Sequence, residues 1–357
     1  MIKKTEEQLA KTKLKGTEKL ELVGSLATMI GSGISILEVV KSLQEDALGG
    51  QKVVLNEMVS DLTQGKRLYV TLAKFPKVFD RVSVNVIRAS EEAGTLDVAL
   101  RDLRATLQKD MEFNDKIRSA LTYPFFIIVV FFGILTMILV FVIPKISTVF
   151  LQLNVPLPVP TRIMLFLSDL VVKQTQWFLT GLGLFVATIY YILRFHRQAV
   201  LEVLYRMPLV KTLIMQIDVT NFARNLSVLL ASGLPITQAL ELVTEVVIRS
   251  RTKTLLTVTK GMVLAGRPLS EGFRSDPTAL SSIVIKLVEA GEKTGSLDHS
   301  LQEIAEYFDY KVTYTLKTLT ALLEPLMLVL VAVVVGGMML AIIAPVYGLI
   351  SQIGGGK

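Results

Sequence analysis

The stretch Leu322–Pro345, LLEPLMLVLVAVVVGGMMLAIIAP, is apolar after its single glutamate, and its two prolines lie twenty residues apart. Upstream, Leu121–Pro144 reads LTYPFFIIVVFFGILTMILVFVIP and has two prolines at the same separation. A helix needs about 20 apolar residues to cross a hydrocarbon core about 30 Å thick. We therefore predict transmembrane helices at 121–144 and 323–345.

A third apolar run, residues 174–194, has Trp177 at one end and Tyr190 and Tyr191 near the other. Aromatic residues at both ends of such a run are typical of membrane interfaces. The alternative is a large soluble protein with buried core helices, but those helices are usually shorter and interrupted by charge. The chain is 51% hydrophobic and 19% charged, with a mean hydropathy of +0.54. These values favour substantial soluble mass attached to three spans.

Lysine and arginine near the spans predict the orientation. They are concentrated before 121, after 194 and before 323, and are sparse in 145–173 and at the end of the chain. We expect a flexible basic segment at 1–17, cytoplasmic domains at 18–120 and 195–322, an external loop at 145–173 and a short external tail at 346–357. The first residues lack an apolar leader, which favours a cytoplasmic N-terminus. The net charge of +7 also fits a nucleic-acid surface, but the bases are interspersed with acids, so we predict no nucleic-acid partner.

The chain repeats itself at an offset of 201 residues. Pro124 maps to Pro325 and Pro144 to Pro345, and the segment ASEEAGTLDVAL from Ala89 aligns with AGEKTGSLDHSL from Ala290. Such self-similarity indicates a duplicated unit. Each copy is a soluble domain followed by a span, and the middle span allows both copies to start on the same side of the membrane.

Each soluble copy has helical periodicity. Apolar residues recur at helical spacing from Leu20 to Ile30, and Ser35–Glu38 reads as a capping box at the start of the next helix. No alternating strand pattern of useful length occurs. We predict an all-α membrane protein with two homologous cytoplasmic bundles of about six helices each and three transmembrane helices, the last helix of each bundle continuing into the membrane.

The motifs resemble those of the type II secretion F family, whose members are inner-membrane platform proteins of type IV pilus and type II secretion machines. The similarity covers nearly the whole chain. The family signature G-E-x-x-G-x-L is present at Gly291–Leu297, whereas the first copy has Ser90 in place of the glycine. Further matching motifs are Tyr123-Pro124, Glu324-Pro325 and Leu157-Pro158-Val159-Pro160-Thr161.

The resemblance implies a scaffold in the bacterial inner membrane that couples a cytoplasmic secretion ATPase to polymerisation of pilins or pseudopilins. Its other implied partners are further inner-membrane assembly proteins, the lipid bilayer and additional copies of itself in a homo-oligomer. The sequence leaves open which fibre or secretion system is served. It also leaves open how ATPase motion would be transmitted.

The signature defines a corner in each copy. Gly94 and Gly295 are expected to end one helix in the αL conformation, with Thr95 or Ser296 capping the next. Glu91 and Glu292 can accept hydrogen bonds from free N–H groups at the start of that following helix. The competing interpretation, which we favour, makes the corners a docking surface for a cytoplasmic partner. The candidate residues are Glu91, Gly94, Leu96, Glu289, Gly291, Glu292, Gly295, Leu297 and Asp298.

Small residues at four-residue spacing in the last span, Ala332 with Gly336 and Gly337 with Ala341, suit close helix packing. The alternative is that these small residues only face lipid and take no part in helix packing. Glu324 is read as an anion at the start of that helix. The remaining candidates for membrane-helix packing are the prolines, Pro124, Pro144, Pro325 and Pro345.

Several classes of chemistry lack their motifs. No phosphate-binding G-x-x-x-x-G-K-[ST] loop and no paired-histidine site occurs. The acids Glu92, Asp97, Glu289 and Asp298 would allow a loose hard-metal site, but no ligand-spaced loop accompanies them. A transporter or channel, the main rival, would need polar residues inside the spans, and a membrane-anchored metal enzyme would need convergent ligands. We predict a non-enzymatic scaffold with no cofactor and no metal.

Overall fold

The computed structural model describes residues 2–145, 148, 159–172, 180, 184, 188, 191 and 208–354. Every regular element among these residues is helical, as the sequence predicts. The second apolar run, 174–194, lies outside the described residues apart from isolated positions. The prediction of a third span there is therefore not tested.

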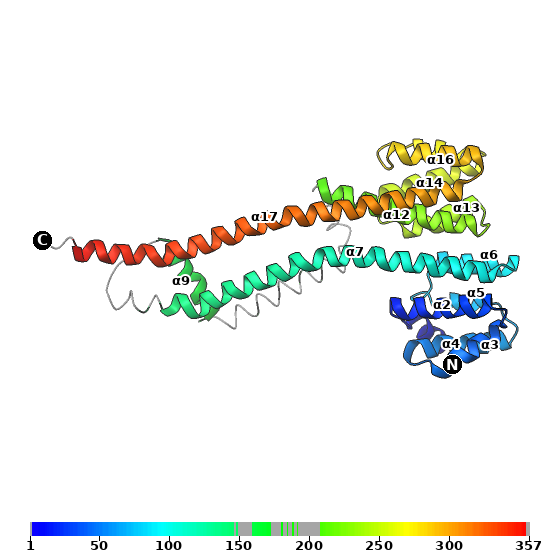
Figure 1. Cartoon of the computed structure of the whole chain (residues 1–357), viewed down its shortest axis with the longest axis horizontal. Coiled ribbons are helices and arrows are strands. Elements are labelled where there is room, and N and C mark those ends of the chain that lie inside the picture. The colour runs from blue at the N-terminus through cyan, green and yellow to red at the C-terminus, as the bar shows by residue number, and fades with distance from the viewer. Residues whose placement is uncertain are drawn as a thin grey trace. The chain divides into compact units, whose positions relative to one another are not determined.

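Copy 1 contains six helices that correspond to the predicted bundle, preceded by one additional short helix. Glycine and proline positions separate them, for example Gly33 and Gly65, which have positive φ angles of 85° and 77°. Ser35 accepts the backbone N–H of Glu38 and so caps its helix, as predicted. The helices are α1 (Ile2–Lys11), α2 (Gly16–Gly31), α3 (Ile36–Asp46), α4 (Gly49–Thr63), α5 (Leu68–Ala73), α6 (Arg81–Ala93) and α7 (Leu96–Met137) (Figure 1).

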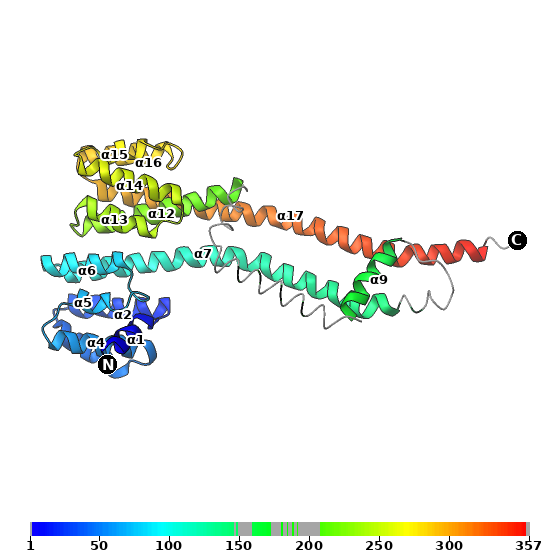
Figure 2. The same ribbon diagram turned by 180° about the vertical axis from the view of Figure 1, so that it is seen from behind.

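Copy 2 repeats the order. Its positive-φ glycines Gly233, Gly266 and Gly295 stand at the positions of Gly33, Gly65 and Gly94. The helices are α12 (Pro208–Ala231), α13 (Ile236–Val246), α14 (Ser250–Leu264), α15 (Leu269–Arg274), α16 (Ser282–Thr294) and α17 (Leu297–Gly354) (Figure 2). The predicted number of about six helices per copy is confirmed.

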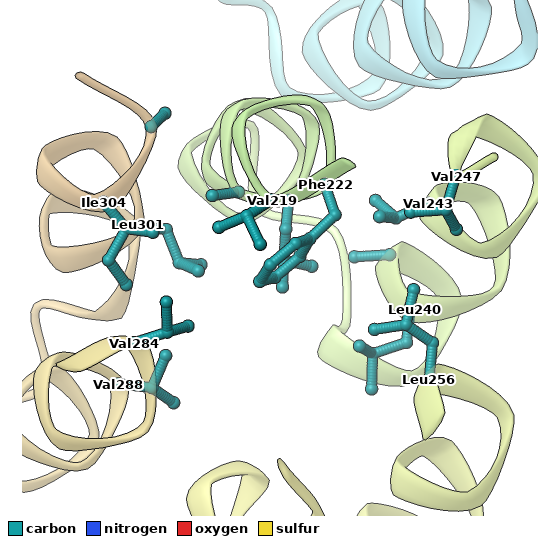
Figure 3. Packing of buried hydrophobic residues seen from close by; sticks show 14 of the residues in the cluster. Val219, Phe222, Leu240, Val243, Val247, Leu256, Val284, Val288, Leu301 and Ile304 are labelled. Atoms are coloured by element: carbon teal, nitrogen blue, oxygen red, sulfur yellow. The ribbon is translucent and has the colours of Figure 1, made fainter. Parts of the chain in front are cut away.

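Each copy has its own hydrophobic core. In copy 2, Phe222 of α12 is fully buried and meets Phe273 of α15 edge to face, with ring centroids 5.9 Å apart. Side chains from α13, α14, α16 and α17 point toward Phe222 (Figure 3). The corresponding core of copy 1 is built around Leu22, Phe75 and Phe79. Burial of these apolar side chains is what holds the short helices together.

Copy 1 also buries a charged cluster that copy 2 lacks. Asp61 is 1% exposed. Its carboxylate accepts hydrogen bonds from the Lys66 ammonium at 2.8 Å, the Lys74 ammonium at 2.6 Å and the Thr71 hydroxyl at 2.9 Å. A buried carboxylate requires such partners. Met262 occupies the equivalent position in copy 2.

The two copies pack against each other within one compact unit, residues 1–116 and 212–313. Val82 and Val86 of α6 and Ala99 of α7 belong to the core of copy 2. Ion pairs also join the copies: Arg81 with Glu245, Lys109 with Glu306 at 3.0 Å, and Lys116 with Asp309 at 2.8 Å.

Arg224 of α12 anchors this inter-copy contact. Its side chain is only 6% exposed and lies 2.6 Å from Asp110 and 3.5 Å from Asp309. Its guanidinium also lies 5.5 Å from the centre of the Phe113 ring. Because a buried cation is costly without partners, this arrangement favours one relative placement of the two copies.

Residues 117–211 and 314–357 form a second compact unit. It includes the apolar parts of two helical stretches that are long and apolar enough to cross a membrane, Leu96–Lys145 and Leu297–Gly337. Their apolar side chains are exposed rather than buried: Phe125 is 68% exposed and Leu326 is 63% exposed. A core helix of a soluble protein would bury such residues, so these helices are candidate membrane spans.

The last helix of each bundle runs unbroken into its apolar segment, as predicted: α7 has 42 residues and α17 has 58. The first span ends in a π-helix, η1 (Ile138–Val142), which the sequence did not predict. Helix α9 (Val159–Val172) packs on η1, and the buried Ser168 hydroxyl donates to the Leu139 carbonyl at 2.6 Å.

The connecting segments contain helical structure that the sequence did not predict. Residues 1–17 are not simply a flexible segment, because α1 forms there and Leu9 is buried in the copy 1 core. The segment expected as an external loop contains α9. The expected tail is helical as far as Gly354.

Candidate functional site

Glycine ends the helix at each signature corner. Gly94 and Gly295 have φ angles of 76° and 71° and follow the last residues of α6 and α16. In copy 1, the N–H groups of Gly94 and Thr95 both donate to the Ser90 carbonyl. The predicted αL helix ends are confirmed, and a residue with a Cβ would be strained at either glycine.

The two signature glutamates cap a helix, although not the helix that the sequence suggested. Glu91 accepts the backbone N–H groups of Leu68 at 2.8 Å and Tyr69 at 3.2 Å. These residues begin α5, which precedes the corner, whereas the prediction placed the bonds on the helix that follows it. The carboxylate neutralises free donors at a helix N-terminus, where the helix dipole also favours negative charge.

Copy 2 repeats this arrangement. Glu292 accepts the backbone N–H groups of Leu269 and of Ser270, the latter at 3.0 Å, at the start of α15. Each oxygen of the carboxylate therefore serves one donor. In both copies the glutamate ties the end of one helix to the beginning of another, 22 and 23 residues earlier in the chain.

Position 90 departs from the family pattern for a packing reason. A Cβ added to Gly291 would lie 2.6 Å from the Ser300 hydroxyl oxygen and 2.8 Å from its Cβ. The equivalent residues in copy 1 are Ser90 and Ala99. Copy 1 thus has the serine on the first helix and the smaller residue on the second, and copy 2 has the reverse.

The acidic residues near the corners are paired with bases. Glu289 contacts Arg274 and, at 2.8 Å, Lys293, and the Lys293 hydrogen bond followed by the Arg274 charge lowers the pKa of Glu289. Glu92 in copy 1 lies 3.5 Å from Arg67 and 3.2 Å from Arg88. Lys293 lies four residues from Glu289 in the sequence, whereas Arg274 has no local sequence signal and is brought to Glu289 from α15 by folding.

The other corner candidates lie around these glutamates. Leu96 and Leu297 pack against the cores of their own copies. The Asp298 backbone carbonyl accepts the Ser227 hydroxyl at 2.7 Å, which ties α17 to α12, while the residue itself is exposed. The Ser296 hydroxyl lies 2.7 Å from the Thr294 hydroxyl. Within the described part of the chain, no three His, Cys, Asp or Glu side chains converge as metal ligands.

The candidates in the spans have few contacts. A Cβ at Gly336 or Gly337 would meet no atom within 4 Å, so the small-residue stripe has no close neighbour among the described residues. Side chains of Ala341 and Pro345 lie outside the described set, and Ala332 is exposed. The role of these residues in helix packing stays a prediction.

One expectation about the start of the last span is corrected by the long helices. Glu324 lies in the interior of α17 and so is not a helix-start anion. Pro325 is likewise interior to α17, and Pro124 is interior to α7. Pro144 is partly buried just after η1. Each interior proline removes one backbone N–H donor from its helix.

A duplicated helical bundle with an apolar helix of membrane length at the end of each copy defines a class of membrane protein, and comparison with known proteins identifies the family. The family model described as Type II secretion system (T2SS), protein F matches residues 22–144 and again residues 222–345. The chain belongs to this family. The two matches also confirm the internal duplication.

Relatives from several bacteria are similar over most of their length. The Thermus thermophilus protein named Type IV pilus assembly protein PilC is 30% identical over 331 residues, which are 92% of this chain and 81% of that protein. The Aeromonas hydrophila protein named Type II secretion system protein F is 26% identical over 92% of this chain and 86% of the relative. The Escherichia coli Protein transport protein HofC homolog is 26% identical over 94% and 84%.

Proposed function

We propose that this protein is the inner-membrane platform of a type IV pilus or type II secretion machine. The observation that carries the proposal is the duplicated architecture: a helical bundle passes without interruption into an apolar span, twice, in a chain that matches the family in both copies. The names of its relatives, which refer to pilus assembly and type II secretion, support the same assignment.

In this proposal the bundles are cytoplasmic and receive a secretion ATPase, while the membrane part takes up pilins or pseudopilins. Other inner-membrane assembly proteins complete the complex. The continuous helices α7 and α17 are suited to this role because a stiff helix transmits displacement better than a flexible linker. The protein acts as a scaffold and not as an enzyme.

The signature corners are the proposed docking surface for the ATPase. Since Glu91 and Glu292 are engaged in internal hydrogen bonds, their part is to fix the shape of the corner. Exposed residues near these glutamates then make the direct contact with the ATPase, and Asp298 is the strongest candidate among them. Its side chain has no hydrogen-bond or ion-pair partner among the described residues, unlike Glu289.

The test compares equivalent residues in the two copies. Asp298→Lys in copy 2 is expected to abolish retention of the cognate ATPase on the immobilised full-length protein, because like charge or unpaired charge at an interface is costly. Asp97→Lys, at the matched position of copy 1, is the comparison and should weaken binding less, because the copy 1 corner departs from the family signature at Ser90. Normal binding by both variants, at normal protein abundance, would exclude the copy 2 corner as the docking surface.

A further inference from the structure

The contact between the copies uses two different faces. Copy 1 contributes α6 and α7, and copy 2 contributes mainly α12 and α13. At the repeat offset, Val82 and Val86 of copy 1 correspond to Ile283 and Leu287 of copy 2. Val82 and Val86 are 6% and 1% exposed because copy 2 covers them, whereas Ile283 is 42% exposed.

The same correspondence extends along α7 and α17. Thr106 and Lys109 face the inter-copy contact, where they line a cavity of about 280 Å³ with Arg224. Their equivalents in copy 2 are Tyr307 and Tyr310, which are 43% and 65% exposed. Copy 2 therefore exposes tyrosine and isoleucine on the face that copy 1 uses for binding. Tyrosine is among the residues most enriched in protein interfaces and their hot spots.

The complementary face of copy 1, on α2 and α3, is also exposed. Glu245 of α13 pairs with Arg81 across the inter-copy contact, and Ser232, directly after α12, lines the cavity. Their equivalents in copy 1 are Glu45 and Ser32, and both are exposed. Each chain thus has one pair of complementary faces in contact and a second, equivalent pair with no partner among its described residues.

We propose that the exposed face formed by α16 and the Leu297–Thr313 part of α17 binds the α2–α3 face of a second copy of this chain. The intermolecular contact repeats the relation between copy 1 and copy 2. Because Lys109–Glu306 and Lys116–Asp309 pair in the same order along both helices, α7 and α17 run parallel. Repeating that relation keeps the equivalent helices of every chain parallel, as a shared membrane requires. Such a head-to-tail contact forms a ring if its rotation closes.

Cross-linking can test this arrangement, since the chain has no cysteine of its own. Arg81 corresponds to Ser282 at the offset of 201, and Glu245 corresponds to Glu45 at the offset of 200 that relates Gly33 to Gly233. The Arg81–Glu245 pair therefore becomes Ser282 of one chain with Glu45 of the next. Two tagged full-length forms, Ser282→Cys and Glu45→Cys, are co-expressed, and their membranes are treated with a short bismaleimide. We expect a dimer containing both tags. A dimer of Ser282→Cys with itself would overturn the head-to-tail arrangement, and so would the absence of any cross-linked product.

Leu264→Cys, combined with Glu45→Cys, is the matched control for chance collision. Leu264 is 67% exposed on α14 of the same copy, outside the proposed face. No product is expected from this pair. A yield equal to that of the Ser282 pair would contradict the proposal.

A second measurement does not depend on cross-linking. Tyr310→Glu should weaken self-association of the detergent-solubilised protein about tenfold or more in mass photometry, because it places an unpaired charge in the contact. Leu264→Glu changes an equally exposed apolar residue elsewhere and should leave self-association unchanged. An unaltered oligomer in Tyr310→Glu, or an equal loss in Leu264→Glu, would refute the assignment.

Discussion

The cap formed by Glu292 allows a quantitative prediction for the amides at the start of α15. In the native protein one carboxylate oxygen accepts from Leu269 and the other from Ser270. In Glu292→Gln the side-chain amide retains one acceptor oxygen, and its NH₂ group faces the second backbone donor. One partly buried N–H therefore loses its partner.

An unsatisfied donor of this kind costs about 1–2 kcal/mol. If this loss of free energy is confined to the start of α15, the amides of Leu269 and Ser270 should exchange with solvent about five- to thirty-fold faster. Hydrogen exchange with mass spectrometry on the full-length protein measures this directly in peptides that cover the start of α15. Glu91→Gln should produce an effect of similar size at Leu68 and Tyr69, because the geometry is the same.

Glu271→Gln is the matched control, since it removes a charge from the same helix without touching the cap. Glu271 is paired with Arg267 at 3.3 Å, and both side chains are about half exposed. A surface pair of this kind contributes little, so exchange at Leu269 should change less than about twofold. Unchanged protection in Glu292→Gln, or equal changes in both variants, would refute the capping role.

Three further predictions follow from other sites. Gly291→Ser should cost about 1–3 kcal/mol by crowding Ser300, and adding Ser300→Ala, which removes the hydroxyl but keeps the Cβ, should recover only part of the lost thermal stability. Burial raises the pKa of Asp61, but bonds from its lysine and threonine partners outweigh it and lower that pKa overall. Copy 1 should therefore lose stability as the pH falls through about 4 and below, and Asp61→Asn should remove this dependence in a thermal melt series. A cysteine at Thr161 should react with an impermeant maleimide from outside intact spheroplasts, whereas failure to label there would contradict the proposed topology.

Local patterns were sufficient to predict the helices. Apolar periodicity, the serine cap at Ser35 and the glycines at Gly94 and Gly295 each act within one or two turns, and the structure confirms them. The duplication was visible because proline and glycine positions repeat at a fixed offset. The apolar composition of the spans predicted exposed helices of membrane length, and two are present among the described residues.

Contacts between distant segments could not be predicted in this way. Glu91 reaches a helix that begins 23 residues earlier, and Arg274 approaches Glu289 from a different helix. Neither pairing has a local signal, because both depend on how short helices stack in three dimensions. Helix α9 was missed for a different reason: two prolines near its start read as loop, although proline is tolerated in the first turn of a helix.

The reversed Ser90–Ala99 and Gly291–Ser300 pairs have a consequence for how the two halves of the gene evolve. Copying position 90 into position 291 alone would set two serines against each other at a distance too short for a Cβ. Copying the glycine of position 291 into position 90 would place a glycine beside Ala99 and open a void. Gene conversion between the halves is therefore tolerated only when it transfers both positions in one tract, and the duplicated halves are expected to diverge as blocks rather than residue by residue.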